Sequence, residues 1–149
     1  MSRAQELADS IVHRFLTLGR YRRHVSNLIN TAVNLSGRDL ATLRYLAQGG
    51  ARTVSQIGRM LYVRDATVSP MLERLERDGY VTRTRCREDA RKVMVEVTPK
   101  GCEIITQAPP GPVWLMRTHL PELPIAELEE IDHALARLSE IAEVDESLL

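Results

Sequence analysis

The chain has 149 residues, a length that suits one domain of ordinary size. Its composition, 44% hydrophobic and 27% charged residues, excludes a disordered chain and favours a folded globular protein. No apolar run approaches the roughly 18 residues of a membrane span, and the N-terminal segment lacks the apolar stretch of a secretory signal. The two cysteines, Cys86 and Cys102, form neither a disulfide framework nor a metal cluster, so we expect a cytoplasmic protein without metal or other cofactor.

The formal net charge is zero, but the charges are distributed unevenly along the chain. Residues 1–51 carry seven arginines against three acidic residues, and residues 52–92 carry ten basic residues against six acidic ones. Residues 121–149 carry nine acidic residues and one arginine. Because the local field matters more for nucleic-acid binding than the total charge does, a basic body with an acidic end remains compatible with DNA as a partner.

Two helices are predicted at the start of the chain. Apolar residues at helical spacing predict a first helix over about residues 3–32. Ser36, with Asp39 three residues later, predicts the start of a second helix, which Gly49 and Gly50 end.

A pair of short helices follows. Thr53 and Gln56 fit a capping box for a helix ending near Leu61, and after a turn over residues 62–64 Asp65 is expected to cap a helix reaching about Asp78. Two short helices joined by a short turn are typical of a helix-turn-helix.

The segment after these helices alternates between apolar and polar residues. Residues 80–85 and 93–97 predict two strands of a hairpin with a charged tip, which after a helix-turn-helix is a wing. Thr98 and Pro99 predict the start of another helix, and the prolines over 109–112 are expected to break it or to kink it sharply. A segment over residues 113–120 follows, and a last helix is expected over about 125–142, which gives a mainly α-helical fold with a small β-hairpin wing.

The residues of the wing resemble a known family. Asp89-Ala90-Arg91, then Val97-Thr98 and Lys100-Gly101, resemble the D-x-R and L-T-x-K-G signature of the MarR (multiple antibiotic resistance regulator) family, with Val97 in place of leucine. The resemblance implies a single MarR-like domain over 1–149, with a winged part over about 36–98 and a helical dimerisation part over about 3–32 and 99–144. It also implies a homodimer that acts as a transcriptional regulator, a repressor whose operator binding is modulated by a small-molecule effector.

The sequence departs from the family in two places. Ala90 stands where the family usually has arginine. Residues 67–70, Thr-Val-Ser-Pro, resemble the branch of the family that senses organic hydroperoxides through a cysteine in the first helix, but this chain has no cysteine there. Cysteine-based peroxide sensing is therefore not expected.

The second helix of the pair is expected to enter the major groove, with the wing at the neighbouring minor groove. Arg74 is the leading candidate for guanine or phosphate, Arg91 is expected to insert into the minor groove, and Asp89 to hold Arg91 in position. Pro70 is expected to delay or bend the start of the helix. The candidate DNA-binding residues lie on or directly beside these two elements and are expected to be exposed: Arg64, Thr67, Ser69, Pro70, Arg74, Arg77, Arg85, Arg87, Asp89 and Arg91. Two copies of the domain would read a pseudo-palindromic operator in double-stranded DNA.

Other interpretations remain open at this stage. Arg14, Tyr21, Trp114 and His119 form a candidate effector pocket, and packing at a helix break and dimer core is the plainer explanation for the same residues. Cys86 and Cys102 leave open a redox-responsive regulator, and the fold also serves in protein–protein interaction modules that bind no DNA. The polar residues form no catalytic arrangement, so an enzyme is not expected.

Overall fold

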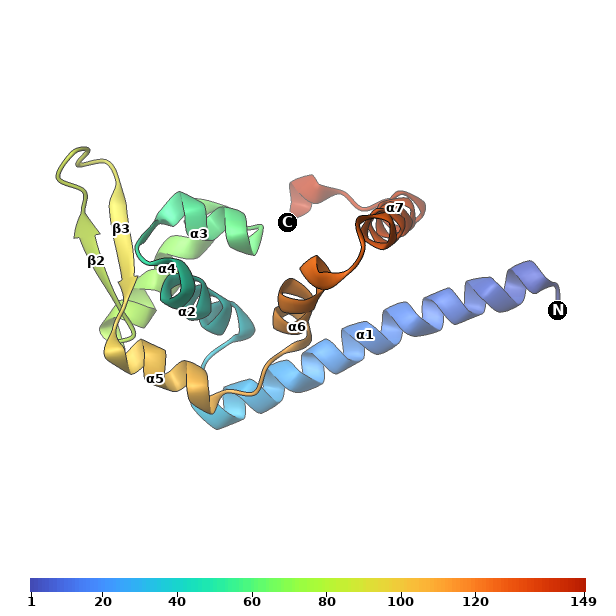
Figure 1. The fold of residues 1–149 in the computed structure, drawn as a ribbon, viewed down its shortest axis with the longest axis horizontal. Helices are drawn as coiled ribbons and strands as arrows, with labels where there is room; N and C mark the ends of the chain where they lie inside the picture. Colours follow the sequence, from blue (N-terminus) through green and yellow to red (C-terminus); the bar gives the residue numbers. More distant parts are fainter. The chain divides into compact units, whose positions relative to one another are not determined.

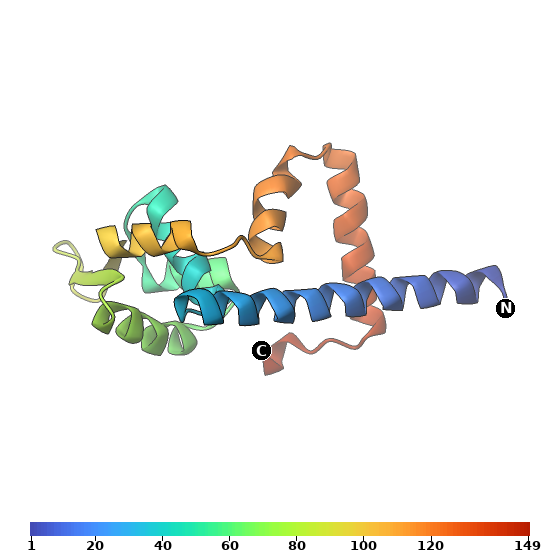
Figure 2. The same ribbon diagram turned by 90° about the horizontal axis from the view of Figure 1, so that it is seen from below.

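The computed structural model describes all residues, 1–149, and its contacts divide the chain into two units, Met1–Pro112 and Val113–Leu149. The first unit holds the helices α1 (Arg3–Val33), α2 (Gly37–Gly49), α3 (Val54–Leu61), α4 (Asp65–Arg77) and α5 (Pro99–Gln107), and the strands β1 (Arg52–Thr53), β2 (Val81–Arg85) and β3 (Val93–Val97). The order of these elements, drawn in Figures 1 and 2, is that of a winged helix preceded by one long helix.

The helix starts follow the capping signals in the sequence. Ser36 accepts a hydrogen bond from the backbone N–H of Asp39 while the Asp39 carboxylate accepts one from the N–H of Ser36, which begins α2 as predicted. Thr53 and Gln56 make the same reciprocal pair at the start of α3. Because each exchange satisfies two backbone or side-chain donors within one turn, these boundaries are set locally.

The start of α4 corrects two predictions. The helix begins at Asp65 with Arg64 as its N-cap, so Asp65 is not the cap; its carboxylate instead accepts a hydrogen bond of 2.9 Å from the Ser55 hydroxyl on α3. Pro70 lies inside the helix, and α4 begins five residues before it, so the predicted late start is wrong. A proline removes one helical hydrogen bond, and the packing of the buried residues around Pro70 maintains the helix there.

The predicted hairpin is present, but the sheet has a third strand that the sequence did not indicate. β2 and β3 pair antiparallel from Val81 opposite Val97 to Arg85 opposite Val93, and β1 pairs with the other edge of β3. β1 has only two residues, too few for an alternating pattern to be recognised. The sheet therefore ties the start of α3 to the wing.

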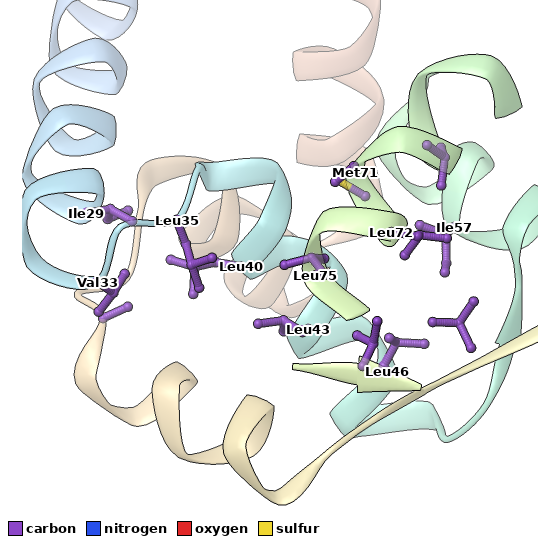
Figure 3. Packing of buried hydrophobic residues seen from close by; sticks show 14 of the residues in the cluster. Ile29, Val33, Leu35, Leu40, Leu43, Leu46, Ile57, Met71, Leu72 and Leu75 are labelled. Carbon is purple, nitrogen blue, oxygen red and sulfur yellow. The ribbon is translucent and has the colours of Figure 1, made fainter. Parts of the chain in front are cut away.

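The hydrophobic core lies among α2, α3, α4 and the sheet, with the C-terminal end of α1 and the end of α5 packed against it (Figure 3). Fully buried side chains at helical spacing on α2 and α4, such as Leu43 and Leu72, belong to the same hydrophobic cluster as Val95 of the sheet. Burial of such side chains stabilises the fold by roughly 1.5–3 kcal/mol each. This core fixes the positions of α4 and the wing relative to each other.

The second unit contains the C-terminal helices. Helix α5 ends at Gln107, so the helix is interrupted at the proline cluster as predicted. The chain then forms α6 (Pro112–His119), η1 (Leu120–Glu122), α7 (Ile125–Ile141) and η2 (Glu146–Leu148). Neither α6 nor α7 has a buried residue. None of the helices of the chain is long and apolar enough to cross a bilayer.

Candidate nucleic-acid interface

The turn between α3 and α4 is tight because Gly58 allows a close approach of the backbone. The carbonyl oxygen of Gly58 accepts a hydrogen bond of 3.0 Å from the N–H of Val63. A Cβ atom on Gly58 would lie 2.9 Å from the Val63 carbonyl oxygen and 3.2 Å from a carboxylate oxygen of Asp65. Together with the contact from Ser55 to Asp65, this close packing fixes the angle at which α4 leaves α3.

The exposed face of α4 carries several of the predicted DNA-binding residues. Arg64, Thr67, Pro70 and Arg77 are exposed, and Arg77 makes no hydrogen bond or ion pair. The hydroxyl of the half-buried Ser69 donates to the carbonyl oxygen of Asp65 at 3.2 Å, one turn back in the same helix. The structure thus brings these residues to one helix, and their contacts with DNA stay a prediction.

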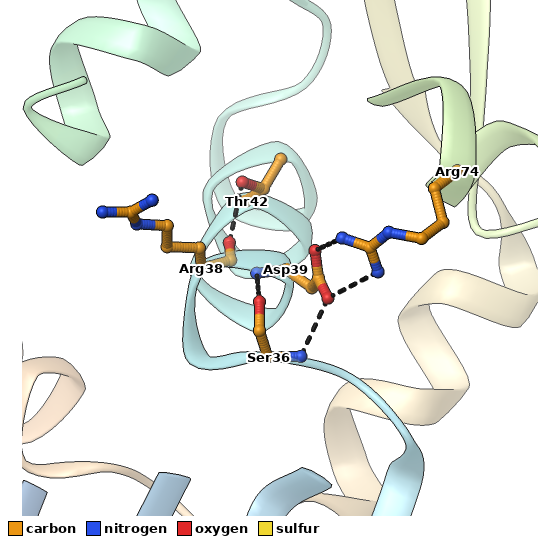
Figure 4. A network of polar contacts seen from close by, with 5 residues as sticks. All are labelled: Ser36, Arg38, Asp39, Thr42 and Arg74. Carbon is orange, nitrogen blue, oxygen red and sulfur yellow. Dashed lines mark hydrogen bonds and ion pairs between the residues drawn. The ribbon is translucent and has the colours of Figure 1, made fainter. Parts of the chain in front are cut away.

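Arg74 has a different partner from the one the sequence suggested. Its guanidinium donates from Nη1 to Oδ2 of Asp39 at 3.0 Å and from Nη2 to Oδ1 at 2.9 Å (Figure 4). Asp39 is completely buried, whereas the Arg74 side chain is 41% exposed. The hydrogen bonds to Asp39 raise the pKa of Arg74 above its ordinary value. Two donors of the Arg74 guanidinium are thus occupied by a buried carboxylate, and the contact of Arg74 with guanine or phosphate stays a prediction.

The arginines of the wing loop are exposed to solvent. The Arg91 side chain is 95% exposed, and its backbone N–H donates to the Asp89 carboxylate at 3.0 Å, with Nε 3.8 Å from the same oxygen. Arg87 is exposed without a hydrogen bond, and Arg85 donates to the Ala90 carbonyl oxygen at 3.4 Å. The Asp89 carboxylate thus contacts Arg91. The exposed arginines give the loop a basic surface.

An ion pair that the sequence analysis missed joins α4 to the wing. The Glu76 carboxylate accepts three hydrogen bonds from Arg83 on β2: from the backbone N–H at 2.9 Å, from Nε at 3.2 Å and from Nη2 at 3.0 Å. The side-chain hydrogen bond from Arg83 is the main cause that lowers the pKa of Glu76. The pair holds β2, the first strand of the wing, against α4.

The Thr98-Pro99-Lys100-Gly101 segment of the family signature has a structural role. The Thr98 hydroxyl donates to the Gly79 carbonyl oxygen and Lys100 Nζ to that of Asp78, both at 2.6 Å. The Lys100 ammonium also lies 4.8 Å from the centre of the Tyr80 ring. A Cβ on Gly101 would lie 2.6 Å from Cγ2 of Val97 and closer still to the Tyr80 carbonyl oxygen. This segment, the clasp, fastens the start of α5 to the turn after α4.

The candidate effector residues fall in two places. Arg14 and Tyr21 lie exposed on α1 in the first unit, and Trp114 and His119 lie on α6 in the second. His119 Nδ1 is 3.1 Å from a carboxylate oxygen of Glu122. An effector pocket formed by all four residues stays a prediction.

These elements define the chain as a winged helix-turn-helix protein, and comparison with known proteins identifies its family. The family model described as "MarR family" matches residues 35–93. The regulator PecS of Dickeya dadantii is 33% identical over 112 residues, which cover 68% of this chain and 67% of that protein. The chain belongs to the MarR family.

Two further proteins show how far the likeness extends. The organic hydroperoxide resistance transcriptional regulator of Bacillus subtilis is 35% identical over 69 residues, 46% of this chain and 47% of that protein, so the match spans about half of that relative's length. The crystal structure of the transcriptional regulator BldR from Sulfolobus solfataricus has a TM-score of 0.64 at 23% identity and covers 92% of this chain and 99% of its own. The fold is therefore shared well beyond the matched sequence.

Proposed function

We propose that this chain is a sequence-specific, double-stranded DNA-binding transcriptional regulator. The observation that carries the proposal is the set of exposed arginines on adjoining elements of one winged unit, at the two ends of α4 and along the wing: Arg64, Arg77, Arg85, Arg87 and Arg91. Arginine suits phosphate and guanine contacts as well as narrow minor grooves. The relatives named as transcriptional regulators support this proposed function. A regulator of this kind acts by binding and not as an enzyme.

The proposed active form is a homodimer, with both units acting as a single MarR-like domain. Besides Met1, seven large apolar residues in the first 24 residues of the chain are exposed: Leu7, Ile11, Val12, Phe15, Leu16, Leu18 and Tyr21. An exposed apolar face of this extent favours association with a second copy. Two-fold symmetry then requires a pseudo-palindromic operator with half-sites about one helical turn apart.

Repression and control by a small molecule complete the proposal. MdtR of Bacillus subtilis, 29% identical over 107 residues, is named a transcriptional repressor. A small-molecule effector would act by its different affinity for the DNA-bound and the free spacing of the two recognition helices. A cytoplasmic location agrees with a DNA-binding role and with the two unpaired cysteines.

The test is selection of bound fragments from a genomic DNA pool, followed by titration of the selected site. Arg91→Ala is expected to weaken binding by roughly tenfold, about 1–2 kcal/mol, and to reduce the salt dependence. Arg3→Ala, which removes the same charge from the N-terminal end of α1, is the matched control and should leave the affinity unchanged. Failure to enrich any sequence would leave the protein–protein interaction module as the better explanation. Equal affinity before and after oxidation would remove the redox-responsive alternative.

A further inference from the structure

The Asp39 carboxylate is the only fully buried acidic group of the chain, and all of its contacts are charged or backbone donors. It accepts from both terminal nitrogens of Arg74 and from the backbone N–H of Ser36 at 2.8 Å. A buried carboxylate without such partners would be strongly destabilising. The folded state therefore requires Arg74 to remain where it is, although Arg74 lies on the helix expected to enter the groove.

The geometry of this contact fixes the orientation of α4. Two parallel N–H···O bonds between a planar guanidinium and a carboxylate define a direction as well as a distance. Arg77, three residues further along the same helix, is exposed and makes no ion pair. The bidentate contact thus restrains the rotation of α4 about its axis relative to α2, whereas the neighbouring arginine is left available for DNA.

One oxygen of Asp39 also connects α4 to the end of α1. Oδ2 accepts both from Arg74 Nη1 and from the N–H of Ser36, three residues after α1 ends at Val33 (Figure 4). Val33 and Leu35 are buried in the same core as α2. The contact that orients α4 therefore shares an oxygen with a backbone group three residues beyond the end of α1.

The opposite side of α4 is held by the wing. Glu76 follows Arg74 by two residues, which places it about 200° around the helix, and it accepts the three hydrogen bonds from Arg83. The ion pairs of Arg74 and of Glu76 therefore restrain α4 on two opposite sides. The remaining face of the helix is left for the DNA groove.

We propose that Arg74 is a positioning residue for DNA recognition, an inference that rests on the proposed function. Asp39 and Arg74 form a joint that sets the orientation of the recognition helix relative to the end of α1. Arg74 acts through Asp39 and not through a base or a phosphate.

The experiment is a double-mutant cycle on the full-length protein, read out as affinity for the selected DNA at several salt concentrations. Asp39→Asn and Arg74→Gln are each expected to weaken binding by roughly tenfold, and the double variant no further, because either change already removes the joint. Within the Asp39→Asn background, Arg74→Gln should leave the salt dependence unchanged. Asparagine keeps an oxygen that can accept from Ser36, so the start of α2 is retained.

Ser36→Ala is the matched control, since it removes a capping hydrogen bond of 3.1 Å beside the joint but leaves the Asp39–Arg74 pair in place. It should lower stability in urea and leave the affinity for DNA within about twofold of the unaltered protein. Losses that add in the double variant, with a smaller salt dependence, would show that Arg74 touches DNA and would overturn the proposal. Unchanged affinity in both single variants, or an equal loss in Ser36→Ala, would also overturn it. If the unaltered protein bound no DNA, the proposed function would fail together with the joint.

Discussion

The winged part of the chain and its outer helices differ in what they bury. Every buried apolar residue lies between Val25 and Ala108, around the core of the winged part. The first 24 residues and both C-terminal helices contain none, although they carry many large apolar side chains. The core of the winged part is therefore complete within one chain, whereas the outer helices carry large apolar side chains that are exposed.

This difference suggests that the two regions respond to different variables. The stability of the winged part depends on packing and on the ion pairs of α4, which are independent of concentration. The proposed association of the outer helices with a second copy would instead follow mass action. Variants in the two regions should separate these variables.

The largest effect is expected at the clasp. In Gly101→Ala the new methyl group would meet the Tyr80 carbonyl oxygen and the Val97 side chain, so the free energy of unfolding in urea should fall by about 3 kcal/mol. Gly37→Ala is the control, because a Cβ there has no atom within 4 Å. Equal stability of the two variants would contradict the close packing of α5 on the turn after α4.

A smaller effect is expected on α1. Phe15 is 66% exposed, and Phe15→Ala should weaken self-association by roughly tenfold, about 1–2 kcal/mol, while leaving unfolding of the winged part unchanged. Sedimentation over a range of concentrations measures this. Tyr62→Ala serves as the comparison, since Tyr62 is 83% exposed but lies in the turn between α3 and α4. A protein that stayed monomeric at every concentration would contradict the proposal that the outer helices associate while the winged part does not.

The smallest effect concerns the ion pair between α4 and the wing. Because the folded-state pKa of Glu76 is lowered, its contribution is present above the ordinary value of 4.5 and is lost as the pH falls through and below that value. The Glu76 side chain is 38% exposed, so we expect Glu76→Gln to cost less than about 1 kcal/mol at pH 7. This difference should shrink towards pH 3 in urea titrations. The same loss at both pH values, or an equal loss in Glu73→Gln, would argue against the pair.

The elements of the winged part, and the exposure of several of its arginines, follow from local sequence signals. The capping boxes at Ser36 and Thr53, the alternation of the hairpin and the proline break are signals contained within a few neighbouring residues, and the structure has the corresponding elements at nearly the predicted bounds. The exposed arginines of the wing are also evident from the sequence, because a hairpin tip projects its side chains into solvent whatever surrounds it.

Only the folded structure shows which charged residues pair with one another across the chain. Asp39 and Arg74 are 35 residues apart, and neither capping nor periodicity indicates that a helix-capping carboxylate also binds a guanidinium on the recognition helix. The pairing of β1 with β3 and the contacts of Thr98 and Lys100 likewise join distant segments. Local signals extend about one helical turn, whereas burial brings together residues from the whole chain, and burial of Asp39 is what makes Arg74 a structural partner.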